Sequence, residues 1–283
     1  MEPVLKRLPL ESVRPLVIGL TERVPLADGR TRQYVNCDNA ASTPTLAPVA
    51  ESVNRFLRWY SNVHRGSGFK SRLSSWAFDE SRAMVARFVS ADCASNVVIF
   101  CRNATEGINK LARRYPFRRG GVVLTSVMEH HSNELPWRRV AEVVHVAVTE
   151  EGRLDERDFE AKLADLEGRV QLVALTGASN VTGFVNPIHR LARLAHRHGA
   201  EILIDGAQLV PHRPVDMKPD RDPEHLDYLV FSGHKMYAPY GVGVLIGPRQ
   251  TFLGGDPDLV GGGTVDIVTL EDAYWTDLPD KEE

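Results

Sequence analysis

Short apolar segments alternate with charged, helix-like segments through most of the chain. The apolar segments are rich in Val, Ile and Leu, which is typical of buried β-strands. They lie at Asn96–Cys101, Gly121–Ser126, Val143–Val148, Val170–Thr176, Glu201–Asp205, Tyr228–Ser232 and Gly241–Gly247. Helical periodicity follows several of them, as in Leu154–Leu166, with Asp155 as N-cap, and in Ile188–Gly199, with Gly199 as the terminator. This alternation predicts an α/β fold with a mostly parallel central sheet covered by helices on both faces.

Polar side chains gather directly after the predicted strands. In parallel sheets, ligands bind beyond the carboxyl ends of the strands, so these positions are candidates for a site. They are Asn103–Glu106, Glu129–His131, Ser179–Asn180, Asp205–Gln208 and Ser232–Lys235. The Gly241 and Gly243 pair lacks the spacing of a dinucleotide fingerprint and is interpreted as the turn into the last strand.

The first of these positions is the start of a predicted helix. Ala104 and Thr105 lie where a strand runs into that helix, and exposed N–H groups at a helix start suit a phosphate group. An ordinary N-cap by Thr105 explains the same residues equally well. This segment alone does not separate the two interpretations.

Asp205 and the His130–His131 pair each have a simpler alternative. A carboxylate at the end of a buried strand needs a cation or strong donors, so Asp205 is a ligand-binding candidate. A helix N-cap or a structural ion pair is the simpler explanation, and a metal ligand is a third. Adjacent histidines on an extended segment point to opposite sides, so one metal ion is not expected there. An imidazole can instead stack on a flat ring, or the pair can be partly exposed and hydrogen-bonded.

Lys235 follows a buried strand, with Ser232 and His234 beside it. Lysine is rarely buried without a partner, so Lys235 is either a surface residue or a residue whose amine is used. One chemistry requires a lysine, a buried aspartate, a stacking imidazole and an anion-binding helix start together, and it is that of pyridoxal phosphate. Lys235 would form the Schiff base, Asp205 would hold the pyridine nitrogen protonated, and the helix start would bind the phosphate.

Composition narrows the classes of partner. The net charge of −3, from 34 basic and 37 acidic residues, indicates no nucleic-acid or anionic-membrane partner. No apolar run is long enough to span a membrane, and the N-terminus carries prolines and charges instead of a signal segment. Cys37, Cys93 and Cys101 form no CxxC motif, which favours a reducing cytoplasm over a disulfide framework. We therefore expect a cytoplasmic protein without a metal site.

Eight segments, in order, resemble the class V aminotransferase family of the type I pyridoxal phosphate fold. Within that family the chain is similar to the branch of cysteine desulfurases and selenocysteine lyases. The segments are YVNCDNAASTP (Tyr34–Pro44), YSNVHRGSG (Tyr60–Gly68), RNATEGIN (Arg102–Asn109), MEHHSNELPW (Met128–Trp137), ASNVTG (Ala178–Gly183), DGAQ (Asp205–Gln208), SGHK (Ser232–Lys235) and GGGT (Gly261–Thr264). The resemblance extends from Tyr34 to the last residue.

The resemblance implies a role for each matching residue. Lys235, Asp205 and His130 would be catalytic, with His130 stacked on the cofactor ring. The other cofactor-binding residues would be Ala104 through its backbone, Thr105, Asn180, Gln208, Ser232, His234 and, toward a neighbouring subunit, Thr264. The substrate mouth would be lined by Asn39, Ala40, Ala41, His64 and Arg65.

The resemblance also implies domains, partners and an activity. Residues 1–30 would be an N-terminal arm, 31–256 the cofactor-binding large domain, and 257–283 the start of an incomplete C-terminal region. A homodimer with shared active sites, a small amino-acid substrate and a sulfur-acceptor protein are expected. The activity would be removal of sulfur from L-cysteine to give alanine. Another class V reaction (aminotransferase, epimerase or lyase) and a non-catalytic, truncated cofactor-binding protein are the alternatives.

In this family a small C-terminal domain follows the GGGT-like motif. It carries the arginine that grips the substrate carboxylate and, in desulfurases, the cysteine that attacks the substrate sulfur. Neither Cys37, Cys93 nor Cys101 matches that cysteine. We therefore expect these residues alone to bind the cofactor without turning over cysteine.

Overall fold

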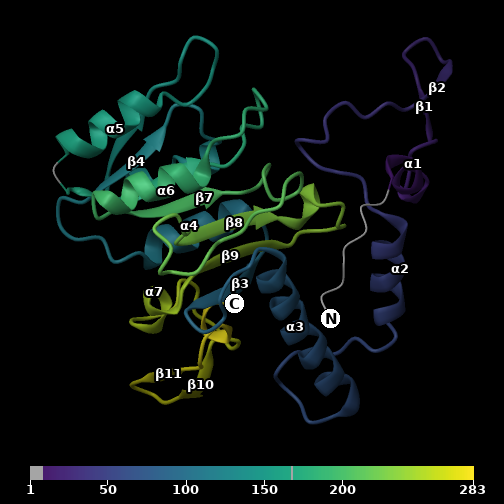
Figure 1. Ribbon diagram of the computed structural model, residues 1–283. Helices are drawn as coiled ribbons and strands as arrows, with labels where there is room; N and C mark the ends of the chain where they lie inside the picture. The colour runs from purple at the N-terminus through teal and green to yellow at the C-terminus, as the bar shows by residue number, and fades with distance from the viewer. Residues whose placement is uncertain (1–8, 167) are drawn as a thin grey trace. The chain divides into compact units, whose positions relative to one another are not determined.

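The computed structural model describes residues 9–166 and 168–283, and the chain divides into two compact units. The small unit comprises Met1–Phe78 and Gly233–Tyr240, and the sheet unit comprises Asp79–Ser232 and Gly241–Glu283. Figure 1 shows the elements of both units. The expected boundaries at residues 30 and 256 remain a prediction. Among the described helices, none is both long enough and apolar enough to cross a bilayer.

A mixed sheet of seven strands forms the centre of the sheet unit, in the order β3-β9-β8-β7-β6-β4-β5 within the described residues. β9 is antiparallel to its neighbours β3 and β8, and all other neighbours are parallel. The strands are β3 (Asn96–Cys101), β4 (Val122–Ser126), β5 (Glu142–Val146), β6 (Val170–Thr176), β7 (Glu201–Asp205), β8 (Tyr228–Ser232) and β9 (Gly243–Pro248). The predicted α/β fold with a mostly parallel sheet is therefore confirmed.

Continuous apolar segments predicted the strand positions well, because a strand that is buried on both faces is apolar along its whole length. Every residue of β4, β6 and β8 is buried. The expected strand Val143–Val148 is shifted, because β5 is an edge strand that ends at Val146. Just beyond that end, the Ala147 N–H donates to the Asp158 carboxylate at 2.7 Å. The Ala147 carbonyl accepts from the Asp155 N–H at 3.0 Å.

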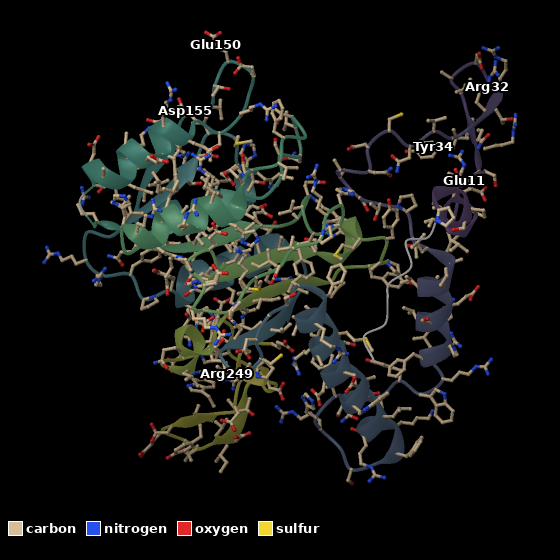
Figure 2. The ribbon with its side chains drawn as sticks, in the orientation of Figure 1. Glu11, Arg32, Tyr34, Glu150, Asp155 and Arg249 are labelled. Atoms are coloured by element: carbon tan, nitrogen blue, oxygen red, sulfur yellow. The ribbon has the colours of Figure 1, made fainter. Side chains whose placement is uncertain are left out.

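Helices cover the sheet, with α4 packed against β8 and β9 and α6 against β7 (Figure 1). Their apolar side chains meet those of the strands, as where Ile108 and Leu111 of α4 join Val230 in one buried core. Asp155 caps α5 by accepting from the N–H groups of Arg157 and Asp158, as predicted, and Figure 2 shows it at that helix start. The helices of this unit are the C-terminal half of α3 (Phe69–Phe88), α4 (Ala104–Arg114), α5 (Glu156–Asp165), α6 (Ile188–Arg197) and α7 (Arg249–Leu253).

The remaining elements are short. The small unit contains the hairpin of β1 and β2, and the sheet unit contains the hairpin of β10 and β11. These elements are α1 (Leu10–Val13), β1 (Arg23–Pro25), β2 (Thr31–Gln33), α2 (Ala47–Phe56), β10 (Val265–Val268) and β11 (Ala273–Trp275). Single 3₁₀ turns are η1 (Arg14–Leu16), η2 (His131–Asn133), η3 (Trp137–Arg139), η4 (Gly233–Lys235) and η5 (Asp280–Glu282).

A carboxylate between two imidazoles ties the end of α6 to the start of β8. Asp227 accepts from His196 Nε2 at 2.9 Å and from His225 Nε2 at 3.1 Å. The Nδ1 atom of His196 lies 2.8 Å from the Pro223 carbonyl oxygen, and that of His225 lies 2.7 Å from the Asp222 carbonyl oxygen. The two rings are stacked, with centroids 4.2 Å apart and planes inclined by 21°. Lone pairs of stacked rings do not converge on one ion, so the cluster fits two protonated imidazoles on one carboxylate better than it fits a metal site.

This cluster predicts a loss of stability in alkaline solution. The hydrogen bond to Asp227 is the main cause that raises the pKa of His225 to about 9, above the ordinary histidine value of 6.5. A raised folded-state pKa means that the stabilisation is complete below about pH 6.5 and is lost as the pH rises through 9. We expect His225→Gln to lower the free energy of unfolding by about 2 kcal/mol at pH 6 and much less at pH 10. Urea unfolding at both pH values measures this, and an equal loss at both would contradict it.

Candidate functional site

The start of α4 meets the end of β8. The backbone N–H of Ala104 donates to Ser232 Oγ at 2.8 Å, in a buried position. The N-cap of α4 is Asn103, whose side chain accepts from the Glu106 N–H at 3.0 Å, so the alternative interpretation of Thr105 as the cap is wrong. The hydroxyl of Thr105 lies instead 2.7 Å from Ser132 Oγ. The first turn of α4 and a strand-end serine thus form one polar corner that suits an anion.

Gly243, at the start of β9, lets this corner close. A Cβ added to Gly243 would lie 2.4 Å from the backbone carbonyl carbon of Asn103 and 2.5 Å from its Cα. The sequence interpretation of Gly241 and Gly243 as a simple turn missed this reason. The first residue of β9 must lack a side chain because the N-cap of α4 packs directly on it.

The substitution Gly243→Ala should therefore displace the start of α4. We expect a loss of about 1–3 kcal/mol in the free energy of unfolding, since overpacking forces backbone shifts. Phosphate-bearing ligands that need this helix start should also bind more weakly. Gly254→Ala is the matched control, because its added Cβ meets nothing within 4 Å. Equal stability and equal phosphate affinity of the two variants would show that the contact is unimportant.

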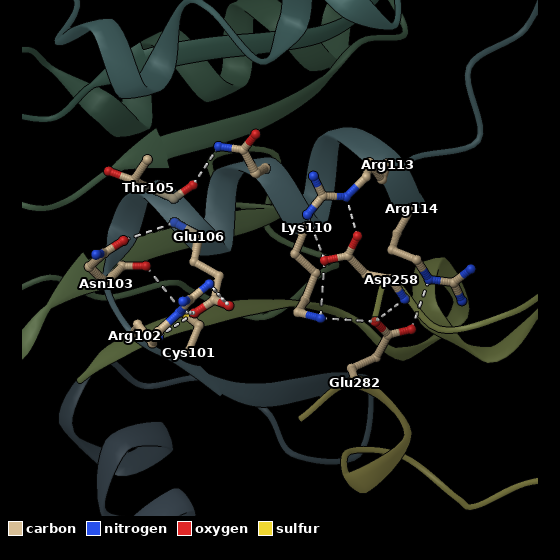
Figure 3. A network of polar contacts seen from close by, with 11 residues as sticks. Cys101, Arg102, Asn103, Thr105, Glu106, Lys110, Arg113, Arg114, Asp258 and Glu282 are labelled. Carbon is tan, nitrogen blue, oxygen red and sulfur yellow. Dashed lines mark hydrogen bonds and ion pairs between the residues drawn. The ribbon is translucent and has the colours of Figure 1, made fainter. Parts of the chain in front are cut away.

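The other end of α4 is fixed by buried ion pairs (Figure 3). Lys110 Nζ lies 3.5 Å from Asp258 and 3.4 Å from Glu282, and both carboxylates are fully buried. Arg114 pairs with Glu282 at 2.8 Å, and Arg113 pairs with Asp258. Burial alone would raise the pKa of Asp258, but Arg113 and Lys110 outweigh it and lower that pKa. These ion pairs hold α4 in place and are expected to be costly to break singly.

Asp205 ends β7 and is buried, with 5% of its surface exposed. Its Oδ1 accepts from the Ala207 N–H at 2.9 Å, and the Gly206 N–H donates to the Val230 carbonyl at 2.7 Å. Turns rather than a helix follow, so the alternative of a helix N-cap is wrong. Gln208, in these turns, is also buried, at 9% exposure.

His130 lies in the turn that follows β4. Its ring is exposed, and its Nδ1 accepts from the Ser132 N–H at 3.1 Å and lies 3.0 Å from Ser132 Oγ. Because Ser132 also contacts Thr105, a polar chain links His130 to the first turn of α4. The sequence reasoning missed Ser132, although a hydroxyl two residues after the histidine was visible.

In the small unit, Lys235 is half-buried in η4, three residues beyond the end of β8. The carbonyl of the preceding His234 accepts from the Thr43 N–H at 2.9 Å, and Thr43 Oγ1 accepts from the Tyr237 N–H at 2.7 Å. Thr43 lies two residues after the Asn39–Ala41 segment, so these bonds hold the end of that segment near the turn that contains Lys235. Burial, and then the charge of Lys235, lower the pKa of His234.

The backbone after Lys235 is strained. Tyr237 and Tyr240 have φ of 60° and 67°, values that non-glycine residues seldom adopt. His64 likewise has φ of 53°, and its N–H donates to Ser75 Oγ at 2.8 Å. Strain of this kind gathers at functional sites. The strain indicates that the surrounding structure holds these loops in defined conformations.

The other predicted residues lie apart from these contacts. Asn180 is exposed in a turn in which Ser179 Oγ accepts from the Val181 and Thr182 N–H groups. Arg65 is exposed beside His64. Thr264 is buried at 5% exposure, and its hydroxyl donates to the Gly261 carbonyl at 3.0 Å. Their functional roles, like those of the other site residues, stay predictions.

Comparison with known proteins gives a consistent set of relatives. The chain is 37% identical over 265 residues to a cysteine desulfurase of Haloferax volcanii, a match that covers 90% of this chain and 61% of that protein. It is 36% identical over 285 residues to a cysteine desulfurase of Dickeya dadantii, covering 97% of this chain and 66% of that protein. The chain thus spans less than two thirds of the length of these relatives.

The fold agrees with a solved structure of the same kind. The apo structure of a cysteine desulfurase from Thermococcus onnurineus superimposes with a TM-score of 0.82 at 32% identity, covering 97% of this chain and 66% of that one. The family model described as Aminotransferase class-V matches residues 35–283. This chain therefore belongs to the class V aminotransferase family, whose members depend on pyridoxal phosphate.

Proposed function

We propose that the protein is a pyridoxal phosphate-dependent enzyme of the cysteine desulfurase type, which removes sulfur from L-cysteine and leaves alanine. The observation that carries this proposal is the buried corner where the Ala104 N–H meets Ser232 Oγ, next to strands whose ends carry Asp205 and lead into Lys235. The similarity to desulfurases of two organisms, over most of this chain, supports L-cysteine as the substrate.

The residues present fit the cofactor. The positive end of α4, together with the hydroxyls of Thr105 and Ser232, suits a phosphate dianion, and the close approach of Gly243 keeps side chains out of that corner. Asp205 is buried at a strand end, where a carboxylate needs a cationic partner such as a protonated pyridine nitrogen. His130 is exposed, so its ring is free to cover a flat ligand.

In the proposed mechanism each residue has a separate task. When bound, pyridoxal phosphate supplies an electron sink for the substrate Cα. The Lys235 amine would hold the cofactor covalently and would then move the proton at the substrate Cα. Asp205 would keep the proton on the pyridine nitrogen, and the start of α4 would hold the phosphate. His130 would exclude water from one ring face.

The sulfur-accepting group is a separate question. Burial raises the pKa of the Cys101 thiol to about 12, so this cysteine is not a thiolate at neutral pH and does not suit nucleophilic attack. Cys37 and Cys93 are exposed, but neither corresponds to the nucleophile expected from the family resemblance. The proposal therefore includes a sulfur-accepting cysteine outside these three.

The proposal extends to assembly and location. A homodimer with shared active sites, with Thr264 directed to the phosphate of the neighbouring subunit, follows from the family resemblance. A cytoplasmic location is supported by three cysteines without a disulfide. A sulfur-acceptor protein would take the product.

The test is a product analysis of the protein reconstituted with pyridoxal phosphate. We expect the protein together with its sulfur-accepting cysteine, given L-cysteine and a reductant, to release alanine and sulfide in equal amounts, whereas residues 1–283 alone should bind the cofactor without turnover. A product without sulfide, such as a keto acid or the D-isomer, would indicate another class V reaction and contradict the proposal. Cofactor binding with no reaction of any amino acid, even with the sulfur-accepting cysteine present, would support a non-catalytic role instead.

A further inference from the structure

We infer that Glu129 is a positioning residue which, as a neutral carboxylic acid, holds the His130 turn on the end of the sheet. The inference rests on the proposed function only in giving His130 its task of covering the cofactor ring. Glu129 directly precedes His130, and the sequence reasoning gave it no role of its own.

The carboxyl group of Glu129 connects three segments. Its Oε1 lies 2.6 Å from Ser126 Oγ at the end of β4, and its Oε2 accepts from Asn133 Nδ2 at 2.7 Å in η2. The backbone of Thr176, at the end of β6, lies close enough to favour the charged form of this carboxyl group. Thr176 is the register partner of Asp205 on β7. The turn that carries His130 is thus fastened to one strand end and lies close to a second, beside the aspartate.

Asn133, at the other end of this hydrogen-bond network, is also held in place. The fully buried Trp137 donates from Nε1 to the Asn133 carbonyl at 3.1 Å and to Asn133 Oδ1 at 3.3 Å. Asn133 is itself completely buried. A change in the Glu129 carboxyl group is therefore passed through Asn133 to the indole of Trp137.

The surroundings favour the protonated form of Glu129. Burial raises its pKa to about 8, although Ser126, Thr176 and Asn133 favour the charged form, and the charge of Asp205 adds to the rise. The neighbouring His130 points its Nδ1 at Ser132 instead. A neutral acid keeps the same contacts, because it can donate to Ser126 Oγ while it accepts from Asn133.

Neutrality has a consequence for Asp205. With Glu129 protonated, its carboxyl group adds no negative charge beside Asp205. Above pH 8 such a charge would appear there, and a buried charge favours opening of the turn to water. The placement of His130 should therefore weaken in alkaline solution.

The decisive experiment uses the protein without cofactor. Carbon-13 NMR of glutamate-labelled protein should show one carboxyl that titrates near pH 8, together with a change in the emission of the buried Trp137. Glu129→Gln should remove both transitions. Glu134→Gln is the matched control from the same turn, since Glu134 is paired with Arg138 and His145, and it should keep both.

A second readout is cofactor affinity. Glu129→Gln reproduces the hydrogen bonding of the neutral acid and should bind pyridoxal phosphate within about threefold of the unchanged protein, whereas Glu129→Ala should bind it about tenfold more weakly. A Glu129 carboxyl that titrates in the ordinary acidic range, or a Glu129→Gln protein that keeps the transition, would overturn the inference. Because the titration needs no activity, an intact titration without sulfide release would reject only the proposed function.

Discussion

Replacing Lys235 by alanine is expected to abolish covalent binding of pyridoxal phosphate and to lower turnover by about 100- to 10,000-fold. The same amine would hold the cofactor and move the substrate proton, and proton transfer by a positioned group contributes rate factors of this size. The bond between the Ala104 N–H and Ser232 Oγ, at the proposed phosphate corner, does not involve Lys235, so non-covalent binding should remain. Visible absorption before and after denaturation and gel filtration separates the two kinds of binding.

Lys162→Ala provides the control for Lys235→Ala. Lys162 is partly exposed on α5 and pairs with Asp158, four residues earlier, far along the chain from the candidate site. This variant should keep covalent binding and full turnover. Normal turnover of the Lys235→Ala protein would remove Lys235 from the mechanism.

The substitution Asp205→Asn should leave cofactor binding nearly intact and reduce turnover by about 100-fold or more. An amide at this position can still accept the 2.9 Å hydrogen bond from the Ala207 N–H, so the turn after β7 should be preserved. It carries no charge, however, and cannot stabilise a protonated pyridine nitrogen. The loss of preorganised electrostatic stabilisation typically costs factors of this order.

Asp216→Asn is matched to this change. Asp216 also accepts from a backbone N–H two residues later, that of Lys218 at 2.9 Å, but it is exposed and outside the candidate site. Cofactor titration and steady-state kinetics of both variants separate the charge effect from the turn. Near-normal turnover of Asp205→Asn would contradict the role given to the carboxylate.

The fold was largely predictable because apolar periodicity is local. Four of the seven predicted strands, β3, β6, β7 and β8, match the structure residue for residue. The failure at β5 has a physical cause. Unlike β3, the other edge strand, β5 is mostly half-exposed, so its apolar residues do not mark its end, and the bonds of Ala147 to Asp155 and Asp158 end it instead.

The candidate site was predictable only in part. The positions of Ala104, His130, Asp205 and Ser232 near strand ends were predictable, since they follow from the order of the elements, while their roles stay predictions. The contacts among residues distant in sequence were not visible, such as Thr43 on the His234 carbonyl and the approach of Gly243 to Asn103. The local pattern cannot distinguish Thr105 from Asn103 as the helix cap. In the structure, the side chain of Asn103 makes the capping bond.

The central claim is that Lys235 carries the cofactor. Reducing the reconstituted protein with borohydride fixes pyridoxal phosphate to the amine that holds it, and peptide mapping by mass spectrometry then identifies that residue. We expect one label per chain, on Lys235 in the segment Gly233–Lys235 that follows β8. A label on any other lysine, or no label on a protein that binds the cofactor tightly, would contradict the role proposed for Lys235.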